Sequence, residues 1–153
     1  MSEPGVAALV EVLDSLVGLA PWRVRLGHGN FVTADFGRVV VPPGESGERG
    51  EWHLWIYGAA WRIDSARDVV AGSEDTREVM SAAVGGLEGE RLLGVRLRTP
   101  SLGLDLDFGG VVLRVFPVTT RVEDHWMLFT PSGEVFVAGP GSRWRSGDAS
   151  RIG

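Results

Sequence analysis

The sequence Leu102-Gly-Leu-Asp-Leu-Asp-Phe-Gly-Gly-Val-Val-Leu-Arg-Val-Phe116 decides the fold of this chain. Its first half alternates apolar residues with Asp105 and Asp107, so a strand here would carry apolar side chains on one face and carboxylates on the other. Gly109 and Gly110 follow, and a two-residue hairpin turn needs the positive φ angles that glycine adopts readily. The alternation then resumes, which predicts a β-hairpin with one buried face.

The overall composition is that of a globular protein. The chain has 153 residues, of which 44% are hydrophobic and 23% charged, a balance typical of one soluble domain. We expect that domain to span residues 1–145 and the polar residues 146–153 to form a flexible tail. No window approaches the roughly 18 consecutive apolar residues of a membrane span, and Glu3 and Pro4 interrupt the start that a signal peptide needs. We therefore expect a cytoplasmic protein that does not bind membranes.

The choice of charged residues excludes several chemistries. All 15 basic residues are arginine, and the sequence contains neither lysine nor cysteine. Lysine Schiff bases and phosphate-loop lysines are therefore excluded, as are disulfides, thiol nucleophiles and cysteine-ligated zinc. The net charge is −5 and the arginines form no cluster, which argues against binding to nucleic acid.

The periodicity of apolar residues indicates a mixed fold. Residues 4–19 and a segment beginning at Asp75 repeat apolar residues at three and four positions, as in a helix that buries one face. Most other apolar residues alternate with polar ones, including residues 52–57 and 60–63, which are predicted to form paired strands around Gly58. Two helices and about eight or nine strands place the chain in the α+β class.

The two halves of the sequence match in register, which predicts an internal duplication with repeats at residues 4–64 and 75–138. The small changes of offset fall where loops intervene, as insertions into loops would produce. Two such helix-led units with antiparallel sheets would form tandem repeats related by a pseudo-twofold axis. The matched positions are Leu9 with Met80, Leu13 with Val84, Leu16 with Leu87, Asp35-Phe36-Gly37 with Asp107-Phe108-Gly109, Trp52 with Trp126, and Ile63 with Val137.

Aromatic residues supply the first set of candidate site residues. Alternation places Trp55 and Tyr57 on the strand face opposite Leu54. That aromatic face needs a cover, either another part of the chain or a binding partner. Tryptophan, tyrosine and arginine dominate the binding energy of protein interfaces. The candidate binding residues are Trp55, Tyr57, Arg62 and Trp126.

Histidines next to carboxylates supply the second set, in Glu51-Trp52-His53 and Asp124-His125-Trp126. If the two segments converge, Glu51, His53, Asp124 and His125 are candidate ligands for zinc or another divalent cation, or members of an acid–base pair. Neighbouring residues of a strand point to opposite faces, however, so Asp124 and His125 cannot both face one site within a regular strand. A structural role at the strand ends is the alternative.

The run Trp126-Met-Leu-Phe-Thr-Pro131-Ser132-Gly133-Glu-Val, with the later Gly139-Pro140-Gly141-Ser-Arg-Trp144, resembles the C-terminal half of small uncharacterised actinobacterial proteins. Some families of that appearance are similar to immunity proteins of bacterial toxin systems. The resemblance covers about the last third of the chain and rests on structural motifs. It implies a non-catalytic protein that binds another protein, and it assigns no functional residue.

These observations favour a non-catalytic binding protein that acts through a protein–protein interface, with neutralisation of a toxin as its sharpest form. An acidic protein of this kind complements a basic partner. The partner is another protein or a second copy of the chain, and no cofactor is expected. Two alternatives stay open: a metal-binding protein or metal-dependent enzyme that uses His53 and His125, and a homodimer that binds a small ligand.

Overall fold

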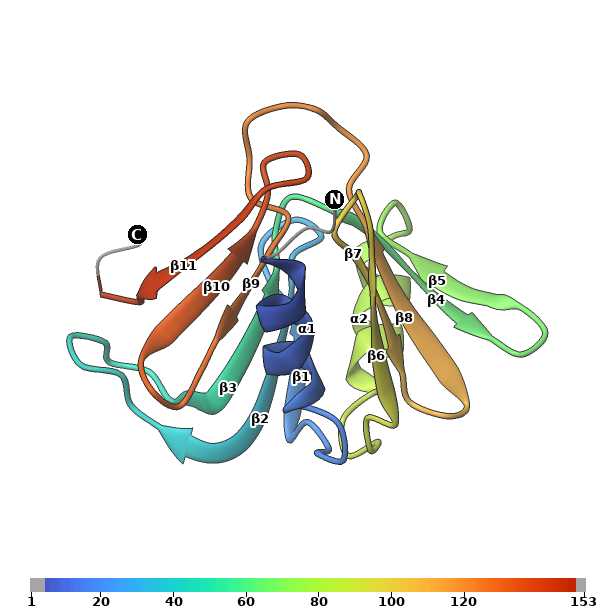
Figure 1. The fold of residues 1–153 in the computed structure, drawn as a ribbon. Coiled ribbons are helices and arrows are strands. Elements are labelled where there is room, and N and C mark those ends of the chain that lie inside the picture. The colour runs from blue at the N-terminus through green and yellow to red at the C-terminus, as the bar shows by residue number, and fades with distance from the viewer. Residues whose placement is uncertain (1–4, 151–153) are drawn as a thin grey trace.

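The computed structural model describes residues 5–150, and this part of the chain contains two α-helices and eleven strands in two antiparallel sheets (Figure 1). The predicted α+β class and the two helices are confirmed, whereas the strands outnumber the expected eight or nine. The expected helix start at residue 4 and the tail residues 151–153 lie outside the described residues.

The first sheet has six strands in the order β1-β2-β3-β9-β10-β11, and the second has five in the order β5-β4-β8-β7-β6. Neighbouring strands are antiparallel in both sheets. The strands are β1 (Arg23–Leu26), β2 (Val32–Val40), β3 (Arg49–Ile56), β4 (Ala60–Ser65), β5 (Val69–Gly72), β6 (Gly94–Arg98), β7 (Gly103–Asp107), β8 (Val111–Phe116), β9 (Trp126–Phe129), β10 (Glu134–Ala138) and β11 (Trp144–Asp148).

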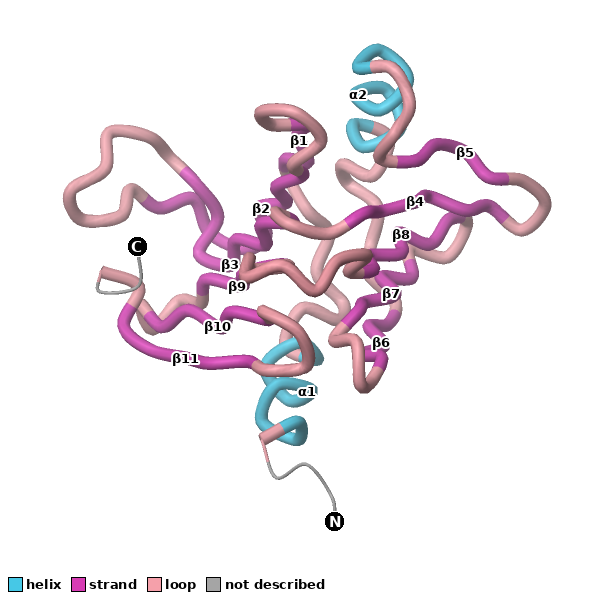
Figure 2. The backbone as a smooth tube through the Cα atoms, turned by 90° about the horizontal axis from the view of Figure 1, so that it is seen from above, coloured by secondary structure: helices cyan, strands magenta, loops and turns pink. Residues whose placement is uncertain are grey.

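Each sheet contains strands from both halves of the chain. The chain builds β1, β2 and β3 in the first sheet, crosses to place β4 and β5 in the second, and continues there with β6, β7 and β8. It then crosses back to place β9, β10 and β11 in the first sheet. The central pairs β3–β9 and β4–β8 therefore join distant parts of the sequence (Figures 1 and 2).

The helices α1 (Val6–Asp14) and α2 (Arg77–Gly85) lie at opposite sides of the space between the two sheets (Figure 2). Helix α2 contacts the edge strands β1 and β5, and α1 contacts the edge strand β6. Thr76 caps α2, because its side chain accepts a hydrogen bond from the Val79 N–H. The predicted apolar stripes are buried in part. Leu9, Leu13 and Leu16 near α1 and Met80, Val84 and Leu87 near α2 are buried, whereas Val10, Val17 and Val79, which were also expected in the stripes, are exposed.

The hairpin predicted from the opening stretch is present as β7 and β8. Leu104 lies opposite Val115 and Leu106 opposite Leu113, and all four side chains are buried. Gly109 in the turn has a φ of 92°, in the region that favours glycine. The alternation of apolar and charged residues therefore predicted both the turn and the buried face.

The alignment of Gly37 with Gly109 fails in the structure. Gly109 lies in the turn of a hairpin, whereas Gly37 lies inside β2, where the register shifts between Phe36 and Val39. The φ of Gly37 is 78°, so a glycine permits a bulge that bends the strand rather than a turn that ends it. Sequence alternation does not distinguish these two uses of a glycine with positive φ.

Gly58 does not form the predicted hairpin turn either. Strands β3 and β4 belong to different sheets, and Gly58 lies in the crossover between them. Its N–H donates to the carbonyl oxygen of Asp124, which lies on the returning crossover, and the approach leaves no room for a side chain. Gly58 is therefore required for the close passage of two backbones.

Two buried tryptophans follow the two crossovers at similar places. Trp61 in β4 donates its indole N–H to the carbonyl oxygen of Asn30, and Trp126 in β9 donates to that of Leu102, both at 2.8 Å. Each acceptor precedes a strand of the facing sheet: Asn30 precedes β2, and Leu102 precedes β7. Trp61 and Trp126 thus form the same kind of indole hydrogen bond, whereas Trp52, which the sequence alignment matched with Trp126, forms none among the described residues.

Residues at the expected boundary between the domain and its tail are part of the first sheet. Strand β11 pairs with β10 from Trp144 opposite Ala138 to Asp148 opposite Glu134. Trp144 stacks on Phe136 with a centroid distance of 5.9 Å. An edge strand with one large apolar side chain gives little periodic signal.

Candidate functional site

The candidate binding residues lie in three separate places. Trp55 and Tyr57 lie on or next to β3, on the face of the first sheet that points away from the second sheet and both helices. Arg62 lies on the outer face of the second sheet. Trp126 is fully buried in the core and offers no surface to a partner. The structure therefore brings together only Trp55 and Tyr57.

Trp55 and Tyr57 form an aromatic cluster with Phe31. The Phe31 and Tyr57 rings are 4.6 Å apart between centroids, Trp55 and Tyr57 are 5.3 Å apart, and Phe31 and Trp55 are 6.3 Å apart. All three side chains are only partly buried. Alternation of β3 requires this outward direction, because Leu54 and Ile56 fill the core. Phe31 precedes β2, the neighbouring strand, and completes the cluster.

The candidate metal ligands do not converge. The carboxylate of Glu51 accepts the N–H of Arg38, and the carboxylate of Asp124 pairs with Arg145 at 3.2 Å. His125 is fully buried, with its Nε2 3.0 Å from the carbonyl oxygen of Gly141. Within residues 5–150, no three histidine, aspartate or glutamate side chains are grouped so that they could hold a metal ion.

His53 has a buried carboxylate partner instead. Its Nδ1 lies 2.6 Å from Oδ1 of Asp35, the residue opposite it on β2. Asp35 also accepts the Gly50 N–H and the Arg23 Nε–H, both at 2.9 Å, and its side chain is fully buried. Burial raises the pKa of Asp35, but hydrogen bonds from His53 and Gly50, the positive charge of His53 and the bond from Arg23 outweigh it, so the pKa falls to about 2.

Asp35 can orient the imidazole of His53 as in an acid–base pair, but the remaining contacts of His53 are packing contacts and involve no second catalytic group in the described residues. The His53 ring packs against Phe129 with centroids 5.8 Å apart, and the Arg49 guanidinium lies over the Phe129 ring, 4.6 Å from its centroid. No Ser, Thr or Tyr hydroxyl in the described part of the chain forms a hydrogen bond with His53. The pair connects β2 to β3 next to the bulge and stabilises the bent end of that hairpin.

A cleft of about 440 Å³ opens beside the aromatic cluster, where the two crossovers pass between the sheets. Phe31 and Tyr57 form its aromatic wall, while Arg121 and Glu123 come from the returning crossover. Asn30 and Ser73 form a polar wall, joined by a hydrogen bond from the Asn30 side-chain amide to the Ser73 carbonyl oxygen. The volume lies in the range of roughly 300–1,000 Å³ that is typical of small-molecule sites.

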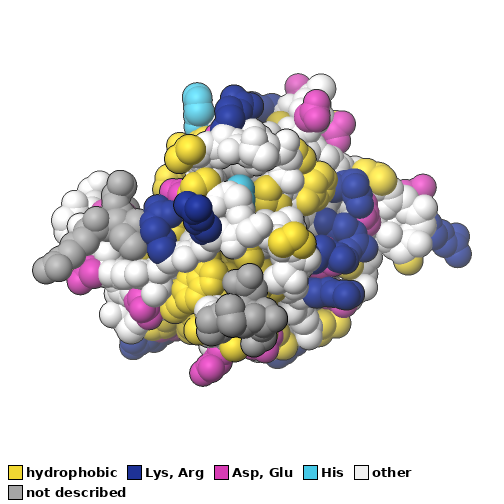
Figure 3. Space-filling view, turned by 45° about the horizontal axis from the view of Figure 1, so that its top comes forward, with side chains coloured by type: hydrophobic (Ala, Val, Ile, Leu, Met, Phe, Trp, Pro, Cys, Tyr) yellow, Lys and Arg dark blue, Asp and Glu magenta, His cyan; other side chains and the backbone are white. Residues whose placement is uncertain are grey.

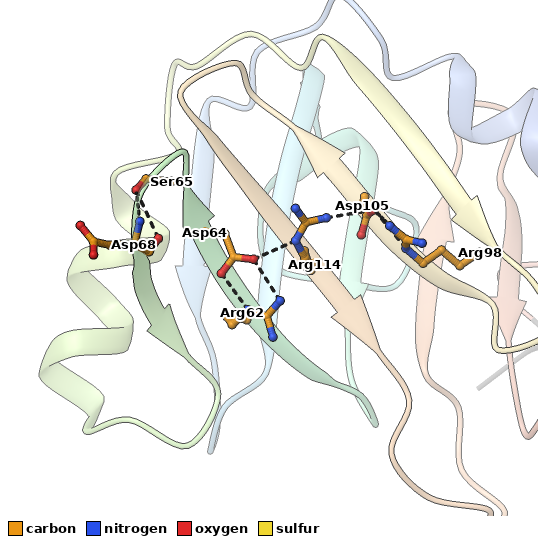
Figure 4. Close-up of polar contacts among 7 residues, drawn as sticks. All are labelled: Arg62, Asp64, Ser65, Asp68, Arg98, Asp105 and Arg114. Atoms are coloured by element: carbon orange, nitrogen blue, oxygen red, sulfur yellow. Dashed lines mark hydrogen bonds and ion pairs between the residues drawn. The ribbon is translucent and has the colours of Figure 1, made fainter.

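The outer face of the second sheet carries a different surface, an arginine–aspartate network that crosses four strands (Figure 4). Asp64 accepts hydrogen bonds from Arg62 at 2.7 Å and Arg114 at 2.8 Å. Asp105 pairs with Arg114 at 3.1 Å and with Arg98. The hydrogen bond from Arg62 lowers the pKa of Asp64, against burial, and Arg114 adds to this effect. The charges largely satisfy one another, so the network stabilises a solvated sheet face.

Hydrophobic and arginine side chains gather in different parts of the molecular surface. Figure 3 shows hydrophobic side chains near the middle of the face that includes the crossovers, with arginine side chains gathered over the second sheet on one side and near the first sheet on the other. Val118 and Val122 of the returning crossover are exposed as well.

Comparisons with known proteins give no relative. No protein-family model matches the chain, and no curated protein or solved structure is significantly similar to it. None of the helices in residues 5–150 is long and apolar enough to cross a membrane.

Proposed function

We propose that this chain is a non-catalytic binding protein that acts through a protein–protein interface centred on the aromatic cluster of Phe31, Trp55 and Tyr57. The observation that carries the proposal is that three contacting aromatic rings stay partly exposed on a sheet face that neither helix covers. Large rings lose little conformational entropy on binding and supply most of the energy at the centre of an interface.

The surroundings of the cluster support this assignment. Met127 lies opposite Trp55 on β9, and Phe129 lies opposite His53, so partly buried apolar side chains continue across the sheet. The Arg49 guanidinium lies over the Phe129 ring, 4.6 Å from its centroid, as a charged residue at the polar rim of an interface does. The net charge of −5 favours a basic partner, which is the electrostatic form expected of an inhibitor that neutralises a basic toxin.

The proposal includes an origin by duplication, with a pseudo-twofold axis between the halves. Three observations support it: the element order, the buried helix stripes and the paired tryptophans. Both halves begin with a helix and three strands in one sheet and then cross to the other sheet, where the first half places two strands and the second half places three. The indole bonds of Trp61 and Trp126 recur at corresponding crossovers.

Site-specific photo-cross-linking tests the interface. A photoreactive phenylalanine analogue is placed at position 55 in the full chain and, as a matched control, at Phe116, a partly buried aromatic residue on the outer face of the second sheet. We expect one dominant adduct from position 55 in the native host and none from position 116. The adduct is the partner or a second copy of the chain, and mass spectrometry identifies it.

The identified partner is then purified and its affinity measured. Trp55→Ala should weaken binding by about 30-fold, the equivalent of about 2 kcal/mol for a central aromatic residue, while Phe116→Ala leaves it unchanged. The proposal fails if position 55 gives no adduct, or if Trp55→Ala binds the cross-linked protein as well as the unchanged chain does.

A further inference from the structure

The cleft between the crossovers has a wall that is held in place before any ligand arrives. The Ser73 hydroxyl accepts the backbone N–H of Trp61, and the indole of Trp61 donates to the carbonyl oxygen of Asn30. Asn30 in turn donates to Ser73. These three bonds join the start of β2, the start of β4 and the segment before α2, so the polar wall needs no rearrangement to receive a ligand.

Arg121 brings a directed positive charge to this cleft. The Thr119 hydroxyl accepts both the backbone N–H of Arg121, at 3.1 Å, and its Nε–H, at 3.3 Å. This turn fixes the guanidinium while its two Nη groups have no hydrogen-bond partner and no carboxylate within ion-pair distance among residues 5–150. A guanidinium with both Nη groups available matches the two oxygens of a carboxylate.

Glu123 and Glu74 bring negative charge to the same cleft. Neither carboxylate forms an ion pair or a side-chain hydrogen bond within the described residues. The side chain of Glu123 lies across Gly58, since a Cβ at Gly58 would be 3.1 Å from Glu123 Cγ. The cleft therefore offers both signs of charge, held apart from each other, at one aromatic wall.

We infer that this cleft binds an aromatic α-amino acid, or a small molecule with the same three groups. The ring packs against Phe31 and Tyr57, the carboxylate pairs with Arg121, and the ammonium group pairs with Glu123 or Glu74. A flat ring stacks on such a wall, and cation, anion and ring each have a separate counterpart. This inference does not rest on the proposed protein interface, although the two surfaces share Phe31 and Tyr57, because it is argued from the charged and polar groups that line the cleft.

Isothermal titration of the full chain with L-phenylalanine and L-tryptophan tests the site. We expect saturable binding of at least one of them, with a dissociation constant below about 1 mM. Three analogues each lack one group: 3-phenylpropionate has no ammonium, phenethylamine has no carboxylate, and L-alanine has no ring. Each should bind at least about tenfold more weakly than the amino acid.

Variants assign the charges. Arg121→Leu should weaken the amino acid about tenfold yet leave phenethylamine unaffected. The double variant Glu74→Gln with Glu123→Gln should weaken the amino acid but not 3-phenylpropionate. Arg67→Leu, an exposed arginine in the β4–β5 turn, is the matched control and should change nothing.

Two results overturn the inference. One is the absence of saturable heat with either amino acid at about 10 mM, far above the expected dissociation constant. The other is equal weakening by Arg121→Leu for the amino acid and for phenethylamine, because a residue that pairs with the carboxylate cannot affect a ligand that has none. Circular dichroism of each variant confirms that it is folded.

Discussion

Replacing Asp35 by asparagine tests how the bent end of the first sheet is stabilised. The carboxylate is fully buried and accepts three hydrogen bonds, from His53, Gly50 and Arg23. An asparagine of the same shape keeps one acceptor oxygen and turns an NH₂ group toward a donor. Removing one member of a buried ion pair costs about 3–5 kcal/mol, and because Arg23 is 24% exposed we expect about 3 kcal/mol at neutral pH.

The pKa sets how this cost depends on pH. The fall from the ordinary value of 3.8 to about 2 corresponds to about 2.4 kcal/mol of stability. A lowered carboxyl pKa stabilises the folded state above the unfolded-state pKa, and that stability is lost as the pH falls through the folded-state pKa. The difference between the native chain and Asp35→Asn should therefore shrink by about 2 kcal/mol between about pH 6 and pH 2.

Urea denaturation followed by tryptophan fluorescence at a series of pH values measures both quantities. Asp68→Asn is the matched control, because Asp68 is exposed and its carboxylate accepts no hydrogen bond within residues 5–150. A loss below about 1 kcal/mol at neutral pH, or a difference that does not change with pH, would refute the assignment of Asp35 as a buried ion with three donors.

Three further changes test the fold. Gly50→Ala should prevent folding or destabilise the chain by more than about 3 kcal/mol in urea denaturation, because its Cβ would lie 2.6 Å from backbone atoms of β2. The control Gly94→Ala, with open space around the residue, should change stability by less than about 1 kcal/mol. Trp126→Phe should cost about 2–3 kcal/mol in the same assay, since the carbonyl oxygen of Leu102 loses its donor and a cavity forms. A loss of stability no larger than that of Trp55→Phe, at a partly exposed position, would contradict this. Arg114→Leu removes the shared partner of two aspartates at a partly exposed position and should cost about 1 kcal/mol at low salt and less at about 1 M salt; an effect independent of salt would argue against an ionic origin.

Local pattern predicted the parts of the fold that depend on short-range chemistry. The alternation around Asp105 and Asp107 gave the β7–β8 hairpin and its buried face, and the apolar stripes gave both helices. The missed strands, among them β5 and β11, are short edge strands with few buried side chains. The failures at Gly37 and Gly58 have one cause: a glycine reports that a side chain is not tolerated, but not whether a turn, a bulge or a neighbouring backbone is the reason.

The candidate site residues were likewise predicted only where a local pattern determines their position. Alternation along β3 correctly placed Trp55 and Tyr57 on the outer face, whereas Arg62, on a strand predicted to pair with theirs, lies in the other sheet. The burial of Trp126 depends on which sheet it enters, and no local pattern reports that. The pairing of His53 with Asp35 requires the register of two strands, and Arg121 reaches the cleft through a long crossover.

The pairing of β3 with β9 has a consequence for synthesis on the ribosome. Strand β3 ends at Ile56 and β9 begins at Trp126, so β3 keeps an open edge while the 69 residues between them are made. Until then the nascent polypeptide exposes an apolar strand that could recruit a copy from a neighbouring ribosome. Release before Trp126 is made should therefore yield insoluble material, whereas a chain that includes β9 pairs this edge within its own sheet.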